Sequence, residues 1–316
     1  MTEKAEEKQY RCPGESYTIS DSVCRGRQRV NYPKCNVCLE KVEPGGFAQS
    51  HAEPKLSINI FKSYDIRGKY PSELNDTTAH KIGTSIALFF REKNPDVKNI
   101  VVGRDMRLSS KSLANALIEG LCTAGLNVIN VGVVSSEMTY FAVGHYKYDG
   151  GVMVTASHNP AEYNGFKLCR EQAIPVSFET GIDRISKLTK QYHPLRGEHL
   201  GKVIVSDIFA DYKKHVLKFA SNLRHLRVVI DAGNGMAGKT IPLVCEGLPI
   251  EIIPLYFELD GSFPNHEANP LKPENMVDLQ KKVRETRAHL GVAFDGDADR
   301  CVFVDEMGRI IGCDII

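Results

Sequence analysis

Residues 126–155, LNVINVGVVSSEMTYFAVGHYKYDGGVMVT, contain the pattern that decides the fold. The segment begins with a β-rich run at 126–134, continues with a helical pattern over 137–146, and ends with an apolar run at 151–155. A strand, a helix and a strand in this order form a crossover unit whose two strands lie parallel. The segment therefore predicts a parallel sheet with helices packed against its faces.

The same alternation of elements continues on both sides of this segment. A helix at 77–91, a strand at 97–103 and a helix at 109–124 precede it, and Ser109 or Ser110 is the expected N-cap of the last helix. A second series follows, with helices at 208–219, 237–245 and 273–287 and strands at 226–231, 250–257, 290–294 and 301–304. We therefore expect consecutive α/β domains with mixed, largely parallel sheets and helices on both faces.

Composition excludes several classes of protein. Forty basic and 39 acidic residues leave a net charge of +1, which gives no electrostatic reason to bind nucleic acid or a membrane surface. No apolar run approaches the ~18 residues of a membrane-spanning helix. Residues 1–8 are too charged for the apolar core of a signal peptide. We expect a cytoplasmic protein with small-molecule partners, and the sequence leaves its oligomeric state open.

Four cysteines distinguish residues 1–56, which we expect to form an extension and linker. Cys12, Cys24, Cys35 and Cys38 fall within 27 residues, but only the last two form a Cys-x-x-Cys pair. Four thiolates this close could hold Zn²⁺, although such sites usually contain two such pairs. The segment is too small and polar to fold by apolar burial alone. Two interpretations remain open: a zinc site, or a disordered tail.

Residues 155–160, TASHNP, place the hydroxyl of Ser157 on a turn directly after an apolar strand. Open α/β sheets bind ligands at this end of their strands. The residues argue against a serine hydrolase, because adjacent side chains such as those of Ser157 and His158 point apart in an extended segment and no Gly-x-Ser-x-Gly elbow is present. From the residues alone, Ser157 is either an ordinary turn serine or a reactive group.

Residues 295–300, DGDADR, place three carboxylates at alternate positions before Arg300. Asp295, Asp297 and Asp299 repel one another unless a cation lies between them, and ligation by oxygen alone favours Mg²⁺ over Zn²⁺. An EF-hand is excluded, because Arg300 stands where that loop needs glycine and the flanking residues are β-rich. A solvated acidic loop is the alternative.

Residues 233–238, GNGMAG, follow a predicted strand and match the Gly-x-Gly-x-x-Gly pattern of dinucleotide-binding proteins. Glu258 or Asp260 lies about 20 residues later, where that pattern places an acidic residue. A nucleotide-dependent oxidoreductase is therefore an alternative hypothesis. The same glycines also suit a tight turn from a strand into a helix.

Five short motifs follow one another in the order typical of one enzyme family. They are YDIRG at 64–68, TASHNP at 155–160, NGFK at 164–167, DAGNG at 231–235 and DGDADR at 295–300. From about Ile60 to its end, the chain resembles the α-D-phosphohexomutases, which comprise the phosphomannomutases and phosphoglucomutases. The resemblance implies a first α/β domain over 57–203 with the phosphoserine loop, a second over 204–306 with the metal loop, and the start of a third at 307–316.

The resemblance also implies a chemistry for the two loops. Ser157 would carry a phosphoryl group, and Mg²⁺ would bind Ser157 together with Asp295, Asp297 and Asp299. The enzyme would interconvert hexose 1-phosphate and hexose 6-phosphate, of mannose, glucose or both, with hexose 1,6-bisphosphate as its activator.

Five further residues take roles from the same resemblance. Tyr64 and Arg67 would lie at the phosphate, where Arg67 stabilises its charge, and Arg300 would hold a phosphoryl oxygen. His158 would form a hydrogen bond near the phosphoryl group. Lys167, just beyond the turn signal at 164–165, would move the proton of the sugar hydroxyl, which requires a lowered lysine pKa.

The chain departs from the family where it ends, at Ile316. Members of the family continue into third and fourth domains, which carry a sugar-binding loop and the clamp for the distal phosphate. We therefore expect a fragment of a longer protein, and the sequence does not distinguish mannose from glucose. The alternative is a non-catalytic chain that binds sugar phosphates, or a partner through its cysteine-containing arm.

Overall fold

The computed structural model describes residues 9–10, 19–20, 58–194 and 200–312. The chain divides into two units, Met1–Lys55 and Leu56–Ile316. In the first unit, the short strands β1 (Gln9–Tyr10) and β2 (Ile19–Ser20) pair in antiparallel fashion. The cysteines of the zinc hypothesis, Cys12, Cys24, Cys35 and Cys38, lie outside the described residues, so that hypothesis stays a prediction.

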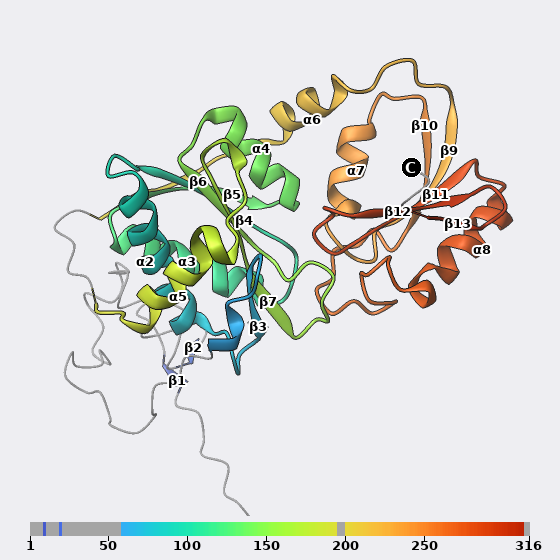
Figure 1. Cartoon of the computed structure of the whole chain (residues 1–316). Helices are drawn as coiled ribbons and strands as arrows, with labels where there is room; N and C mark the ends of the chain where they lie inside the picture. Colours follow the sequence, from blue (N-terminus) through green and yellow to red (C-terminus); the bar gives the residue numbers. More distant parts are fainter. Residues whose placement is uncertain (1–8, 11–18, 21–57, 195–199, 313–316) are drawn as a thin grey trace, which may run out of the picture. The chain divides into compact units, whose positions relative to one another are not determined.

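A six-stranded sheet forms the first half of the second unit (Figure 1). Its order is β3-β7-β6-β4-β5-β8; β4, β5, β6 and β8 are parallel, whereas β7 runs antiparallel to both β6 and β3. The strands are β3 (Ile66–Lys69), β4 (Asn99–Arg104), β5 (Asn127–Val133), β6 (Gly150–Val154), β7 (Tyr163–Arg170) and β8 (Val203–Val205).

Helices cover both faces of this sheet, and successive residues of a strand point to opposite faces, so one strand contributes to two cores. Ile100 and Val102 of β4 belong to the core beneath α2 (Asp76–Lys93), α3 (Ser110–Thr123) and α5 (Asp183–Lys190). Val101 belongs to a separate core beneath α4 (Ser136–Tyr146). Short helical turns complete this half: η2 (Ile58–Ile60), η3 (Glu171–Ala173) and η4 (Phe178–Ile182).

A five-stranded sheet of order β10-β9-β11-β12-β13 forms the second half. The strands β9, β10 and β11 are parallel, and β12 and β13 close the sheet in antiparallel fashion. The elements are α6 (Phe209–Leu217), β9 (Leu226–Asp231), α7 (Ala237–Cys245), β10 (Ile250–Leu255), η5 (Pro273–Met276), α8 (Val277–Thr286), β11 (Leu290–Phe294), β12 (Cys301–Asp305) and β13 (Ile310–Ile311). Val229 packs toward α8, whereas Val228 and Ile230 face the opposite side with Ile241 of α7.

The mixed α/β architecture expected from the sequence is confirmed, and Ser109 is the N-cap of α3 as expected, although its side chain makes no capping hydrogen bond. One local prediction is wrong. The predicted turn at 164–165 lies inside β7, paired with β3. Gly165 serves close packing there: a Cβ at this position would lie 2.0 Å from the Ile66 carbonyl oxygen.

A search of the described residues finds no helix with the length and apolar character needed to cross a membrane.

Candidate active site

The loop after β6 holds Ser157 in an unusual backbone conformation. Ser157 has a φ of 53° and is only 2% exposed. Its backbone N–H donates to Thr155 Oγ1 at 2.8 Å. A left-handed conformation costs a non-glycine residue about 1–2 kcal/mol, so the surrounding contacts must hold it in place. The hydroxyl therefore has a defined position at the carboxyl end of a central strand.

The loop between β11 and β12 brings the three aspartates together. Its ends are joined by hydrogen bonds from Asp295 N to the Arg300 carbonyl (3.2 Å) and from Ala298 N to the Asp295 carbonyl (3.0 Å). One ligand atom from each of Asp295, Asp297 and Asp299 lies within 4.8 Å of the others. Asp295 and Asp297 are buried, so their charges are shielded from solvent.

The two loops meet, although 138 residues separate the atoms that join them. The Ser157 hydroxyl donates to Asp295 Oδ2 at 2.7 Å. The backbones are equally close, because a Cβ on Gly296 would lie 2.6 Å from the Ser157 carbonyl oxygen. The structure thus places the hydroxyl-bearing turn beside the acidic cluster.

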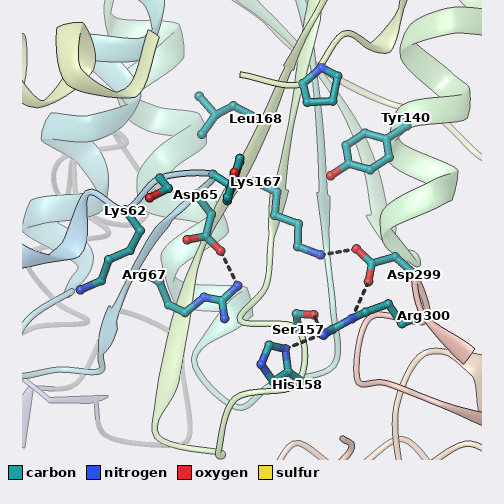
Figure 2. Close-up of a pocket in the computed structure, with 13 residues that line it drawn as sticks. Lys62, Asp65, Arg67, Tyr140, Ser157, His158, Lys167, Leu168, Asp299 and Arg300 are labelled. Carbon is teal, nitrogen blue, oxygen red and sulfur yellow. Dashed lines mark hydrogen bonds and ion pairs between the residues drawn. The ribbon is translucent and has the colours of Figure 1, made fainter. Parts of the chain in front are cut away.

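Lys167 reaches the same cluster from β7. Its ammonium contacts Asp297 Oδ2 at 2.6 Å. The ammonium also pairs with Asp299 (Figure 2). Burial alone would lower the pKa of Lys167, but Asp297 and Asp299 raise it well above its usual value. The lowered pKa that the proton-transfer role of Lys167 requires is therefore absent from this arrangement of charges.

Arg300 connects the serine, the histidine and an aspartate. Its Nη2 donates to Ser157 Oγ at 2.6 Å and to Asp295 Oδ2 at 2.6 Å, and it also contacts His158 Nδ1 (Figure 2). Burial and the nearby Arg300 and Arg67 lower the pKa of His158 to about 4. Because a guanidinium can only donate, Nδ1 of the neutral ring accepts and Nε2 carries the proton.

Arg67 and Tyr64 line the same cavity without touching the serine hydroxyl. Arg67 Nη1 donates to Asn159 Oδ1 at 2.7 Å, and Nη2 pairs with Asp65. Tyr64 is 81% exposed. The cavity measures about 740 Å³ and is lined by Lys62, Ser63, Tyr64, Asp65, Arg67, Tyr140, Ser157, His158, Lys167, Leu168, Pro175, Asp299 and Arg300 (Figure 2).

Comparison with known proteins assigns a family to this geometry. Residues 59–195 match the family described as phosphoglucomutase/phosphomannomutase, alpha/beta/alpha domain I, and residues 209–308 match its domain II. The chain is 41% identical over 261 residues to a phosphomannomutase of Vibrio cholerae, an alignment that covers 80% of this chain. The chain belongs to the phosphoglucomutase/phosphomannomutase family.

Other relatives agree in sequence and in structure. A protein of Xanthomonas campestris named phosphohexose mutases is 42% identical over 81% of this chain. A crystal structure of a phosphoglucomutase/phosphomannomutase family protein from Burkholderia thailandensis superposes with a TM-score of 0.74 at 34% identity, covering 81% of this chain and 57% of that one. This chain spans 56% of the length of the Vibrio and Xanthomonas relatives.

Sequence reasoning missed two contact residues of this family member's site. Ser136, at the start of α4, donates to the Asp297 carboxylate through its hydroxyl and to the Asp297 carbonyl through its backbone N–H. Arg107, in the segment after β4, donates to the Ser157 carbonyl. Arg107 follows the carboxyl end of β4, the strand beside β6, and Ser136 follows that of β5, the next strand in the sheet. Open α/β sheets bind ligands at this edge, so the position of the two residues was the signal that could have found them.

The glycines of the dinucleotide-like pattern have a packing role in this family member. A Cβ on Gly235 would lie 2.7 Å from the Gly296 carbonyl oxygen, and one on Gly238 would lie 2.1 Å from the Phe257 carbonyl oxygen. The N–H of Met236 donates to the Gly296 carbonyl at 2.9 Å. The turn therefore supports the aspartate loop, which weakens the oxidoreductase hypothesis.

The acidic cluster has the properties of a divalent-cation site. Burial, together with the charges of Asp297 and Asp299, raises the pKa of Asp295 to about 7, so the Asp295 carboxyl resists ionisation beside them. Asp297 Oδ1 is buried and has no hydrogen-bond partner in the part of the chain that the structure describes. Three carboxylates and a serine hydroxyl form an all-oxygen donor set, which suits Mg²⁺.

Proposed function

We propose that this chain performs the phosphoryl-transfer half of a phosphohexomutase reaction, with Ser157 as the residue that carries the phosphoryl group. The observation that carries the proposal is the position of Ser157 Oγ, 2.7 Å from Asp295 Oδ2 and 2.6 Å from Arg300 Nη2. The substrates are hexose 1-phosphate and hexose 6-phosphate, of mannose or glucose, and hexose 1,6-bisphosphate is the activator that phosphorylates the serine.

The residues at the acidic loop suit a bound Mg²⁺. Asp295, Asp297 and Asp299, with an oxygen of Ser157, would hold the ion. When bound, Mg²⁺ supplies positive charge that stabilises the transferring phosphoryl group. The buried, unpartnered Oδ1 of Asp297 supports this assignment.

In the first half-reaction, one phosphoryl group moves from phosphorylated Ser157 to a free sugar hydroxyl and one proton moves in the opposite direction; the bond between phosphorus and Ser157 Oγ breaks as the bond to the sugar oxygen forms. The second half-reaction runs in reverse with the other phosphoryl group of the hexose bisphosphate, which returns to Ser157 Oγ and leaves a hydroxyl on the sugar. Lys167 contacts the carboxylates of Asp297 and Asp299, which keep its ammonium protonated; it would accept the sugar proton only with a lower pKa, which a cation bound at these carboxylates would provide. Arg300, which contacts Ser157 Oγ, and the Nε2–H of neutral His158 would donate to the phosphoryl oxygens.

The domain boundaries and the cellular location form part of the proposal. Residues 57–203 correspond to the phosphoserine domain, 204–306 to the metal domain and 307–316 to the beginning of a third domain. The protein acts in the cytoplasm on small sugar phosphates.

The discriminating experiment is intact-mass measurement after incubation with glucose 1,6-bisphosphate and Mg²⁺. We expect one added phosphoryl group in the wild-type chain and in Ser177→Ala, whose serine caps a surface turn. Ser157→Ala should stay unmodified. An unmodified wild-type chain would overturn the proposal in favour of a non-catalytic sugar-phosphate-binding protein, and an added group on Ser157→Ala would assign the chemistry to another residue.

A further inference from the structure

Arg107 is the largest fully buried side chain within the described residues, with 1% of its surface exposed. A buried guanidinium is costly unless its donors are satisfied and its charge is paired. Asp105 provides the counter-charge, with an Nε–Oδ2 distance of 3.3 Å. Asp105 Oδ1 also accepts from the Arg107 backbone N–H at 3.0 Å, which fixes the pair in one arrangement.

The guanidinium binds the backbone of the Ser157 loop at four points. Nη2 donates to the carbonyls of Ser157 (2.7 Å) and Asn159 (2.6 Å). Nη1 donates to the carbonyls of Pro160 (2.8 Å) and Tyr163 (3.1 Å). One planar group thus spans the turn from its reactive residue to the start of β7.

This turn needs such support, because regular structure supplies little of it. Ser157 has the left-handed φ of 53°, and within the turn its N–H bonds only to the Thr155 side chain. Planar guanidinium donors can bind several carbonyls at fixed angles, whereas a lysine ammonium concentrates its three donors on one nitrogen.

The second sheet's loops cover Arg107 from the other side. A Cβ on Gly261 would lie 2.6 Å from the Arg107 Cα, so only glycine fits there. The Phe263 ring lies 5.0 Å from the guanidinium carbon. Arg107 is therefore held between the loop that carries Ser157 and a loop of the half that carries the aspartates.

We propose that Arg107 is a positioning residue, which fixes the Ser157 loop so that the hydroxyl stays at Asp295. It acts through the backbone carbonyls and touches no reacting atom. The expected effect of Arg107 on the rate of Ser157 phosphorylation rests on the proposed function, whereas its expected effect on the conformation of the Ser157 loop does not.

The test compares Arg107→Lys with Arg104→Lys. Arg104 is the last residue of β4, three positions before Arg107, and its Nη1 donates to the Asp105 carbonyl at 3.2 Å rather than to the Ser157 loop. We expect Arg107→Lys to exchange amide hydrogens at 155–163 at least tenfold faster, with other regions unchanged. The maximal rate of Ser157 phosphorylation by glucose 1,6-bisphosphate should fall about 10²-fold, as for other small misplacements of reacting groups.

Two readouts separate positioning from general damage. The bisphosphate concentration that gives half-maximal rate, and the Mg²⁺ affinity, should stay within about threefold of the wild type, since Arg107 contacts no carboxylate of the metal loop. Wild-type exchange at 155–163 in Arg107→Lys, or equal effects in Arg104→Lys, would overturn the proposal. A wild-type chain that is not phosphorylated contradicts the proposed function alone, and hydrogen exchange then decides the role of Arg107.

A second variant covers the case in which Arg107→Lys does not fold, as judged by circular dichroism. Phe263→Leu removes the ring that lies over the guanidinium and leaves the four hydrogen bonds chemically possible. We expect faster exchange at 155–163 in this variant, by a smaller factor. Wild-type exchange there would overturn the proposal.

Discussion

Replacing Lys167 with methionine should tighten the binding of Mg²⁺ to the acidic cluster. Lys167 already occupies two of the three carboxylates, with its ammonium 2.6 Å from Asp297 Oδ2 and paired with Asp299. A cation that binds both carboxylates must displace the ammonium from them. Methionine has a similar length and fills the same space without a charge, so the variant removes this competition.

The size of the effect follows from the burial of the two ion pairs. The Asp297 side chain is fully buried and that of Lys167 is 15% exposed, whereas Asp299 is 24% exposed and better screened. A hydrogen bond to a charged group contributes about 1.5–3 kcal/mol, and exposed pairs contribute less than 1 kcal/mol. Because the lysine can form new contacts with water, we expect a net gain of about 1.4–2.8 kcal/mol, which is a 10- to 100-fold lower Kd.

Isothermal titration calorimetry of Mg²⁺ at low ionic strength measures this change. Lys62→Met is the matched control, because Lys62 lines the same cavity but, within the part of the chain that the structure describes, forms no ion pair with the cluster. The Kd of this variant should stay within about threefold of the wild type. Asp297→Asn should abolish the signal and thereby locate the site. An unchanged or higher Kd in Lys167→Met, with Asp297→Asn silent, would refute the reasoning.

Three further changes test the fold and the site. His266→Gln should lower the free energy of unfolding at pH 6 more than at pH 9. Burial lowers the pKa of His266, but the ion pair with Asp231 outweighs it and raises this pKa, so the pair stabilises the fold fully below the pKa of the unfolded state and the stabilisation is lost as pH rises through the pKa of the folded state. Equal losses at pH 6 and pH 9, measured by urea unfolding, would contradict this. Burial raises the pKa of Glu137 to about 8, so ionising this carboxyl should lower the stability of the wild-type protein as pH rises. Glu137→Gln should abolish this fall. Parallel curves of urea stability against pH for the two proteins, from pH 5 to 9, would contradict the prediction. Gly296→Ala should change the melting temperature by only a few degrees but slow the phosphorylation of Ser157 by at least tenfold, because the new methyl group meets the Ser157 carbonyl. A wild-type rate of phosphorylation in a quenched-flow experiment would show that this contact is not important.

Much of the fold was predictable because its signals are local. Strand β9 and helix α7 occur with the bounds expected from the sequence, since an apolar run and a helical period each reflect burial of one short segment. The prediction at 164–165 was wrong for the opposite reason. Asn-Gly is a turn signal, but Gly165 is needed because β3 approaches it closely, and that contact involves residues about 100 positions away.

The candidate site was predictable to the extent that its residues are chemically distinctive. Ser157 and the carboxylates of 295–299 stood out from their own spacing, and a familiar order of motifs related the two loops. Arg107 and Ser136 did not stand out, because a single arginine or serine after a strand has no distinctive chemistry. Their roles depend on strand order: β4 lies beside β6, and this adjacency brings Arg107 to the Ser157 carbonyl.

A succession of backbone contacts explains why so many glycines surround the two loops. Gly235 approaches the Gly296 carbonyl, and Gly296 in turn approaches the Ser157 carbonyl, each within a distance that leaves no room for a side chain. The position of the hydroxyl relative to Asp295 is therefore set by main-chain packing that passes from the turn after β9, through the aspartate loop, to the turn after β6. The glycine pattern at 233–238, which suggested a nucleotide site, has this structural role: its second glycine, Gly235, keeps the aspartate loop close enough for Ser157 from the other sheet to reach the Asp295 carboxylate.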